Sequence, residues 1–164
     1  MEETIDAILE KIEFEKKDLF KILIQKCIHE SSDSTISSYA THPNVIFKTE
    51  VFFKGFPTFI NEFGKDKKYV AGVHALMVIL EELGIEIEKE ECFILFHIRN
   101  AGKFKIKETK LLEELKSEWA RHKEYKLENQ DFSYALKNLM RIKLIDYRKG
   151  NLQLKPNILI RYRH

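Results

Sequence analysis

Apolar residues in the first third of the chain follow helical spacing first and strand spacing afterwards. Those from Ile5 to Ile12 recur at helical intervals, and the run from Leu19 to Ile28 fits a second helix. Small polar residues then form a serine-rich loop at 31–38. Val45-Ile46-Phe47 and Val51-Phe52-Phe53 are β-branched and aromatic, so we expect one or two short strands there.

A second helical region is expected between Pro57 and Gly84. Pro57 can start a segment in which Phe56, Phe59, Ile60 and Phe63 cluster at helical spacing, and Gly64 would end it. Asp66 can cap the next helix, over 67–83, which Gly84 would terminate. The buried stripe of that helix is expected to contain Val70, Val73, Leu76, Met77, Leu80 and Leu83.

The apolar run Cys92–Ile98 fits a buried helix or a buried strand. A helix is favoured because Glu90 and Glu91 suit its N-terminus and Arg99–Gly102 resembles its exit. Phe104 and Ile106 then alternate with lysines, which indicates a short strand. From Glu108 a strong amphipathic helix is expected to reach about Tyr125, with Leu111, Leu112, Leu115 and Trp119 along its apolar face.

The most informative stretch is a third helix that leads into a tight hairpin. Asn129 is a plausible cap for this helix, whose inward residues are Phe132, Ala135, Leu136, Leu139 and Met140. A strand over 144–147, a turn over 148–151 and a return strand over 152–154 follow. Pro156 ends the return strand or lies at an edge.

These patterns together predict a mainly α fold with small β elements, in the α+β class. The 164 residues suit one domain or two small ones. The short extended link before Glu88 separates a helical N-terminal region with short strands, residues 1–87, from a C-terminal module, residues 88–164.

Charge is distributed unevenly along the chain. The net charge is +2, but residues 132–164 contain eight basic residues and one acidic residue, or 8 − 1 = +7, which leaves −5 elsewhere. The basic residues are Lys137, Arg141, Lys143, Arg148, Lys149, Lys155, Arg161 and Arg163. Such a basic end suits an anionic partner, although charge that serves only solubility is the simpler alternative.

The order helix, strand, helix, helix, hairpin over Glu88–Pro156 resembles the winged-helix (winged helix-turn-helix) superfamily. The most specific residues are the Ala135-Leu136-x-x-Leu139 pattern, the Leu144-Ile145 pair and the hairpin with Gly150. Many such domains have a glycine just before the Leu-Ile pair, where this chain has Lys143. The second helix is also longer than usual, and no tight turn joins it to the third.

The resemblance implies duplex DNA binding, as a regulator or as a subunit of a larger complex. The third helix would enter the major groove, where arginine and asparagine can read base edges. The hairpin would reach the DNA backbone or the minor groove. The candidate nucleic-acid-binding residues are Ser133, Tyr134, Lys137, Asn138, Arg141, Arg148 and Lys149.

Two other interpretations of this module stay open. It can bind protein instead, as a scaffold subunit of a chromosome-organising or defence-type assembly, with the large N-terminal region as a second surface. A homodimer, or a module that bridges protein and DNA, is compatible with this interpretation. The third helix can also be an ordinary solvated amphipathic helix followed by a charged turn.

Catalysis, cofactors and metals are not expected. The chain has no Gly-rich phosphate loop and no Gly-x-Ser-x-Gly motif, and its six histidines lack metal-ligand spacing. His74 and His97 lie in apolar helical stretches and are predicted to be core residues. Glu108-Thr109-Lys110 has a spacing found in some nucleases, but it falls at a helix start. Cys27 and Cys92 are expected to be buried, reduced thiols of a cytoplasmic protein with no membrane segment.

Overall fold

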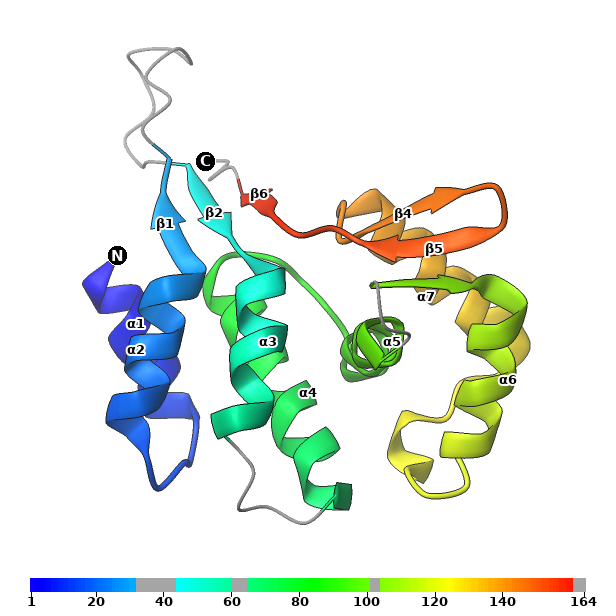
Figure 1. Ribbon diagram of the computed structural model, residues 1–164, viewed down its shortest axis with the longest axis horizontal. Coiled ribbons are helices and arrows are strands. Elements are labelled where there is room, and N and C mark those ends of the chain that lie inside the picture. The colour runs from blue at the N-terminus through cyan, green and yellow to red at the C-terminus, as the bar shows by residue number, and fades with distance from the viewer. Residues whose placement is uncertain (32–43, 60–64, 101–103, 161–164) are drawn as a thin grey trace. The chain divides into compact units, whose positions relative to one another are not determined.

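The computed structural model describes residues 1–31, 44–59, 65–100 and 104–160 (Figure 1). Helices and two small antiparallel sheets make up this part of the chain, so the predicted α+β class is confirmed. The sequence analysis also made predictions for residues that the structure does not describe. They are residues 32–38 of the serine-rich loop, Ile60, Phe63, Gly64, Gly102, Arg161 and Arg163, together with the side chain of Phe59.

The chain forms two compact units that interleave along the sequence. Unit 1 contains Met1–Glu62, Val78–Glu86 and Pro156–His164, and unit 2 contains Phe63–Met77 and Ile87–Lys155. Residues 156–160, assigned to the C-terminal module in the sequence-based division, therefore cluster with the N-terminal elements.

Unit 1 combines helices with a three-stranded antiparallel sheet. Its helices are α1 (Glu2–Lys11), α2 (Lys17–Cys27) and α3 (Thr49–Phe59), and its strands are β1 (Ile28–Glu30), β2 (Val45–Phe47) and β6 (Ile158–Ile160). The strand order is β1-β2-β6, so that Ile46 lies opposite His29 on one side and Leu159 on the other. The sequence analysis predicted β2 but neither of its two neighbours.

The strand expected at Val51–Phe53 is wrong, because these residues lie in α3. Phe52, Phe53 and Phe56 are buried on this helix, and the ring centroids of Phe52 and Phe56 are 5.1 Å apart. Pro57 lies inside α3 and does not start a new segment. A β-branched and aromatic run fits a strand locally, but burial of the phenylalanine face of a helix outweighs that preference.

Helix α4 (Lys65–Glu82) confirms the predicted long helix, with two corrections. Asp66 is its second residue rather than its cap, and Val70 is 43% exposed rather than buried. The other predicted stripe residues are buried, except for the half-buried Met77. Gly84 ends the helix as predicted, with a φ of +81°.

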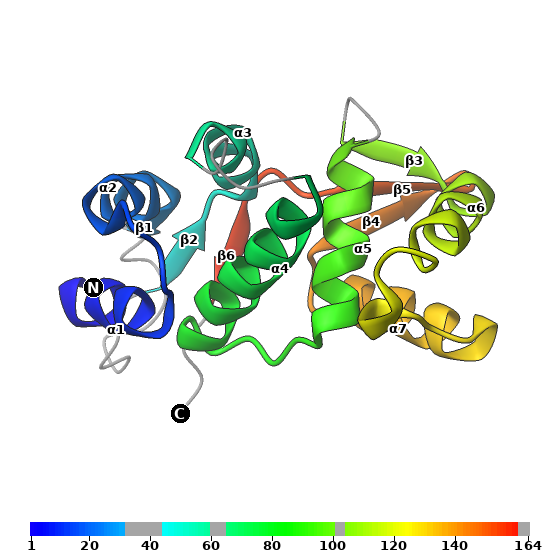
Figure 2. The ribbon, with the colours of Figure 1, turned by 90° about the horizontal axis from the view of Figure 1, so that it is seen from below.

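Unit 2 combines three further helices with a second sheet (Figures 1 and 2). The helices are α5 (Lys89–Asn100), α6 (Glu108–Glu118) and α7 (Asn129–Arg141), and the strands are β3 (Lys105–Lys107), β4 (Ile145–Arg148) and β5 (Asn151–Leu154). β5 lies between β3 and β4, and both pairings are antiparallel. These elements follow the predicted order, and Cys92–Ile98 is a helix rather than a strand.

Helix α5 supplies the core of unit 2. Every residue from Glu91 to Ile98 is buried, including His97, which is 5% exposed. Phe93 stacks on Tyr125 with ring centroids 4.6 Å apart, and the rings of Phe93 and His97 lie 4.9 Å apart. The prediction of a core histidine is thus confirmed for His97 and wrong for His74, whose side chain is exposed on α4.

The predicted continuation of the second helix to Tyr125 is wrong. α6 ends at Glu118, and a short 3-10 helix, η1 (Lys123–Tyr125), follows. This turn of the chain brings His122 and Tyr125 to the ring of Phe93 on α5. Burial of these two rings favours the break over a longer, solvent-exposed helix. α7 begins at Asn129, so the cap position belongs to Glu128 and not to Asn129 as predicted.

The turn from α7 to β4 places Lys143 in the left-handed region, with a φ of +62°. The Leu144 N–H donates to the Leu139 carbonyl (3.0 Å), and the Lys143 N–H donates to the Met140 carbonyl (3.1 Å). This pair of bonds is a Schellman motif, whose left-handed position usually holds glycine. The α4 terminus repeats the motif with Gly84, because the Ile85 N–H donates to the Leu80 carbonyl (2.8 Å).

Replacing Lys143 by glycine is expected to raise the free energy of unfolding by about 0.5–1 kcal/mol, because glycine adopts this conformation without steric cost. Gly84→Ala is expected to lower it by about 1 kcal/mol; no atom lies within 4 Å of the added Cβ, so the cost is conformational. Lys143→Ala is the control, since it removes the charge and keeps the Cβ. Denaturant melts that show equal effects of glycine and alanine at position 143 would contradict this explanation.

Burial, with a smaller effect of His122, lowers the pKa of His97 from 6.5 to about 4. The unfolded chain therefore binds a proton at position 97 as the pH falls below about 6.5, while the folded chain does not until about pH 4. The free energy of unfolding is therefore expected to fall by about 1.4 kcal/mol for each pH unit as the pH is lowered from 6.5 to about 4, or by about 3 kcal/mol in total. Urea melts of wild type and His97→Phe between pH 4 and 7 test this, with exposed His74→Gln as control. Parallel pH profiles for wild type and His97→Phe would refute it.

Candidate nucleic-acid interface

Helix α7 separates an apolar face from a polar one, as the sequence predicts. Phe132, Ala135, Leu136 and Leu139 are buried, and Met140 is half-buried. On the opposite face Ser133, Tyr134 and Lys137 are exposed, with Tyr134 exposed to 75%. The Ser133 hydroxyl donates to the Asn129 carbonyl one turn earlier (3.2 Å), so one of its bonds is already made within the helix.

Asn138 and Arg141 differ from their neighbours because they hydrogen-bond to other side chains. Asn138 Nδ2 donates to Oε1 of the buried Glu91 at 2.6 Å. Its Oδ1 accepts from Arg141 Nε at 3.1 Å and from Arg141 Nη2 at 2.7 Å. Asn138 is half-buried, while Arg141 is exposed. The structure therefore joins these two predicted residues in one network and links them to α5.

The hairpin between β4 and β5 turns through Lys149 and Gly150, whose φ angles are +51° and +76°. Positive φ at both residues of a two-residue loop is the type I′ geometry that suits twisted hairpins. Asn151 Nδ2 donates to the Lys149 carbonyl at 3.2 Å and closes the turn. This geometry projects Arg148 and Lys149 from the end of the sheet, where both are exposed.

The sheet adds two lysines that the sequence analysis did not assign to the site. Lys107 lies opposite Asn151, which lies opposite Arg148, so the three residues share one face of the sheet. Lys105 lies in the next row of that face, opposite Gln153. Both lysines are exposed. The alternation Lys103, Lys105, Lys107 was visible in the sequence, but only the pairing register shows which strand lies beside it.

The hairpin also contacts the start of α6. The Glu108 N–H donates to the Gly150 carbonyl at 3.1 Å. A hydrogen bond between the Tyr147 hydroxyl and the Glu108 carboxylate, together with that negative charge, raises the pKa of Tyr147 above its usual value. Glu108 thus contacts the hairpin turn, and Lys110 forms an ion pair with Glu114 at 3.7 Å.

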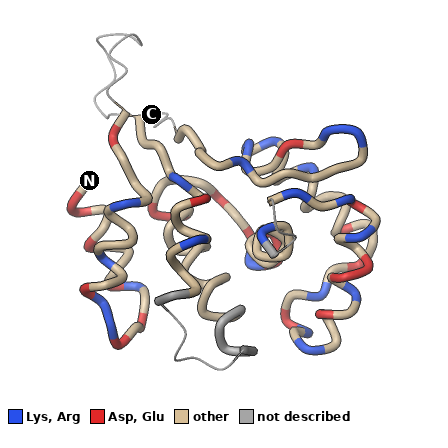
Figure 3. Tube along the Cα trace, viewed as in Figure 1, with Lys and Arg blue, Asp and Glu red and all other residues tan. Residues whose placement is uncertain are grey.

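Lysines and arginines are spread along the described chain (Figure 3), and only some of the lysines form ion pairs. Lys21, Lys54, Lys110, Lys126 and Lys155 each form a salt bridge, the last with Asp146 at 3.3 Å. None of Lys137, Arg141, Arg148 and Lys149 forms one with the residues that the structure describes. Their positive charge is therefore available to an external anion.

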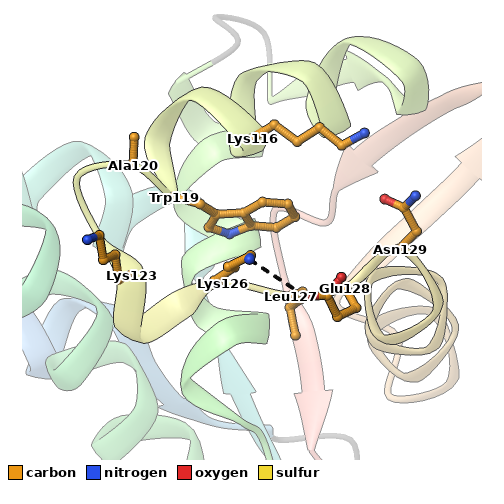
Figure 4. Close-up of a pocket in the computed structure, with 8 residues that line it drawn as sticks. All are labelled: Lys116, Trp119, Ala120, Lys123, Lys126, Leu127, Glu128 and Asn129. Carbon is orange, nitrogen blue, oxygen red and sulfur yellow. Dashed lines mark ion pairs between the residues drawn. The ribbon is translucent and has the colours of Figure 1, made fainter.

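A pocket of about 490 Å³ lies between α6, η1 and the start of α7 (Figure 4). It contains none of the seven predicted residues; its lining is Lys116, Trp119, Ala120, Lys123, Lys126, Leu127, Glu128 and Asn129. Lys126 and Glu128 pair across 3.7 Å at its rim. The Trp119 indole forms one wall and is 7% exposed. The extra residues between α6 and α7 thus form a concave basic surface instead of a tight turn.

Other groups that could support chemistry are dispersed. No cluster of three or more His, Cys, Asp or Glu side chains suited to a metal occurs in the described ranges. Cys27 and Cys92 are free and buried, as predicted, and burial raises the pKa of Cys27 to about 12. Across the same ranges, every helix is too short or too polar to cross a bilayer.

Comparisons with protein families, with curated proteins and with solved structures found no match to this chain.

Proposed function

We propose that the chain is a non-catalytic, cytoplasmic winged-helix protein that binds duplex DNA through α7 and the β4–β5 hairpin. The helix would lie in the major groove, and the hairpin would contact the adjacent backbone or minor groove. Lys137, Arg141, Arg148 and Lys149 would supply most of the attraction to phosphate. Tyr134 and Ser133 would add hydrogen bonds to the backbone.

The proposal rests on the gathering of these four cations, none of them in an ion pair with a described residue, on one helix and its adjoining hairpin. Lys21, Lys54, Lys110 and Lys126 have acidic partners, whereas these four cations lie on one helix and one hairpin with no acidic partner among the described residues. Binding to phosphate releases counterions from DNA, so unpaired cations contribute to affinity without breaking an internal ion pair.

The topology of unit 2 supports the winged-helix part of the proposal. α5, β3, α6, α7 and the β4–β5 hairpin follow in that order, and β3 pairs with the return strand β5. Glycine is common in this superfamily at the position of Lys143. The backbone of Lys143 nevertheless has the left-handed conformation that glycine usually adopts there, so the turn keeps the same geometry. The departure from the family pattern is one of residue type and not of geometry.

The double substitution Lys137→Ala and Arg141→Ala is expected to weaken binding to a mixed-sequence DNA duplex and to flatten its salt dependence. Loss of two phosphate contacts reduces the slope of log K against log salt by about 2. Mobility-shift titrations at several salt concentrations measure both quantities, and circular dichroism checks the fold.

Lys110→Ala with Lys126→Ala is the matched control, because it removes the same charge from unit 2 at lysines that are already paired. Lys149→Asn is a second comparison: asparagine favours the type I′ turn, so this variant should bind more weakly and yet unfold no more easily. If both double variants lose affinity equally, general charge and not the α7 face drives binding. An unchanged slope for the α7 variant would reject the proposal.

A protein-binding scaffold is the second candidate, and one feature of unit 1 favours it. Leu19 and Ile22 lie one turn apart on α2 and are 54% and 47% exposed. Two large apolar side chains exposed side by side suit contact with another protein.

Capture of partners from native lysate, with and without nuclease, separates the two functions. Under the scaffold function, partners remain after nuclease and are lost with Leu19→Ser plus Ile22→Ser. Under the DNA function, capture depends on nucleic acid and is lost with Lys137→Ala plus Arg141→Ala. Nuclease-resistant capture that is insensitive to the α2 variant would exclude this surface of α2 as the docking site.

A further inference from the structure

Glu91 is a buried carboxylate with two different hydrogen-bond donors. It is the third residue of α5, is 4% exposed, and its Oε2 accepts from the Glu88 N–H at 3.0 Å. A glutamate at this position commonly returns to the backbone before the helix in this way. Its Oε1 accepts from Asn138, on α7. Asn138 therefore links the buried carboxylate at the start of α5 to Arg141 on the outer face of α7.

These bonds fix the orientation of the Asn138 amide. Nδ2 must face the carboxylate, because both Glu91 oxygens accept hydrogen bonds, and Oδ1 must face the guanidinium, which only donates. The opposite orientation would place two acceptors together on one side and two donors on the other. Both ends of the amide are thus engaged within the protein, and reading a base edge with Asn138 would require breaking these bonds.

Arg141 keeps most of its donors despite this contact. A guanidinium has five N–H donors, and the two bonds to Asn138 leave 5 − 2 = 3 of them. Those three are on Nη1 and Nη2, at the end of the planar group farthest from the helix. That end can bind two oxygens at once. A guanidinium held by its Nε edge loses less freedom on binding than a free arginine, because it is already ordered.

We infer that Glu91 and Asn138 are positioning residues, which hold the Arg141 guanidinium for a two-point contact with a DNA phosphate. This inference rests on the proposed function and assigns roles within it. Arg141 is the last residue of α7, and the C-terminal end of a groove-bound helix lies near the backbone rather than the bases. Asn138 itself does not read sequence.

A double-mutant cycle tests this coupling on a mixed-sequence duplex with wild type, Asn138→Ala, Arg141→Ala and the double variant. Arg141→Ala is expected to weaken binding about tenfold and to reduce the salt slope by about one. Asn138→Ala is expected to weaken binding by a smaller factor. The double variant should bind like Arg141→Ala alone, because Asn138 acts only through Arg141.

Glu91→Gln extends the test to the buried end of the network. Its amide can no longer offer two acceptors, so the orientation of Asn138 is lost, and binding should weaken only when Arg141 is present. Glu90→Gln is the matched control, with the same charge change in the same helical turn. Urea melts of each variant separate lost stability from lost affinity, since destabilisation does not change the salt slope of the folded protein.

Two results would overturn the inference and leave the proposed function intact. If the factors for Asn138→Ala and Arg141→Ala multiply in the double variant, Asn138 contacts DNA independently, and the proposed function survives without this positioning role. If Asn138→Ala leaves affinity and slope unchanged, the network does not orient Arg141 for binding. A wild-type protein that does not bind the duplex would instead refute the proposed function itself.

Discussion

Complete burial of the middle of α5 is the constraint on which unit 2 depends. From Glu91 to Ile98 no residue of this helix faces solvent, so other elements must cover it on every side. β3, β5, α6, η1 and α7 all contact it. The break between α6 and η1, which places His122 and Tyr125 on the Phe93 ring, follows from the same requirement. The polar face of α7 then points outward because its apolar face belongs to this core.

The same constraint explains why one carboxylate lies inside the unit. Glu91 occupies the first turn of α5, where negative charge is favourable, and it is the first residue of the buried stretch of that helix. Its charge must therefore be met by donors within the protein, which the Glu88 N–H and the Asn138 amide supply. A core requirement at α5 thereby determines which polar groups on the surface of α7 are engaged and which remain available.

The sequence predicts the elements of unit 2 better than those of unit 1. In unit 2 the apolar periodicity, Gly150 and the Leu144-Ile145 pair identify α7 and the hairpin, because local patterns and local structure agree there. In unit 1, Val51–Phe53 fits a strand by residue type but lies in a helix. β1 follows α2 without a break, so its Ile28 resembles the end of the helical run. For the candidate site, exposed Lys137 follows from helical periodicity, and exposed Arg148 and Lys149 follow from the predicted turn. The bond from Asn138 to Glu91 does not, since it joins residues 47 positions apart.

The placement of β6 has a consequence for the order in which the chain folds. Its residues pair with β2, more than a hundred positions earlier in the sequence, whereas most of unit 2 comes from the continuous segment 87–155. During synthesis from the N-terminus, this segment emerges before Ile158–Ile160 does. Unit 2 can thus assemble while β1 and β2 still form a two-stranded ribbon, and such a ribbon is only marginally stable. Unit 1, whose first residues are translated first, can therefore be completed only after the C-terminal strand has been synthesised.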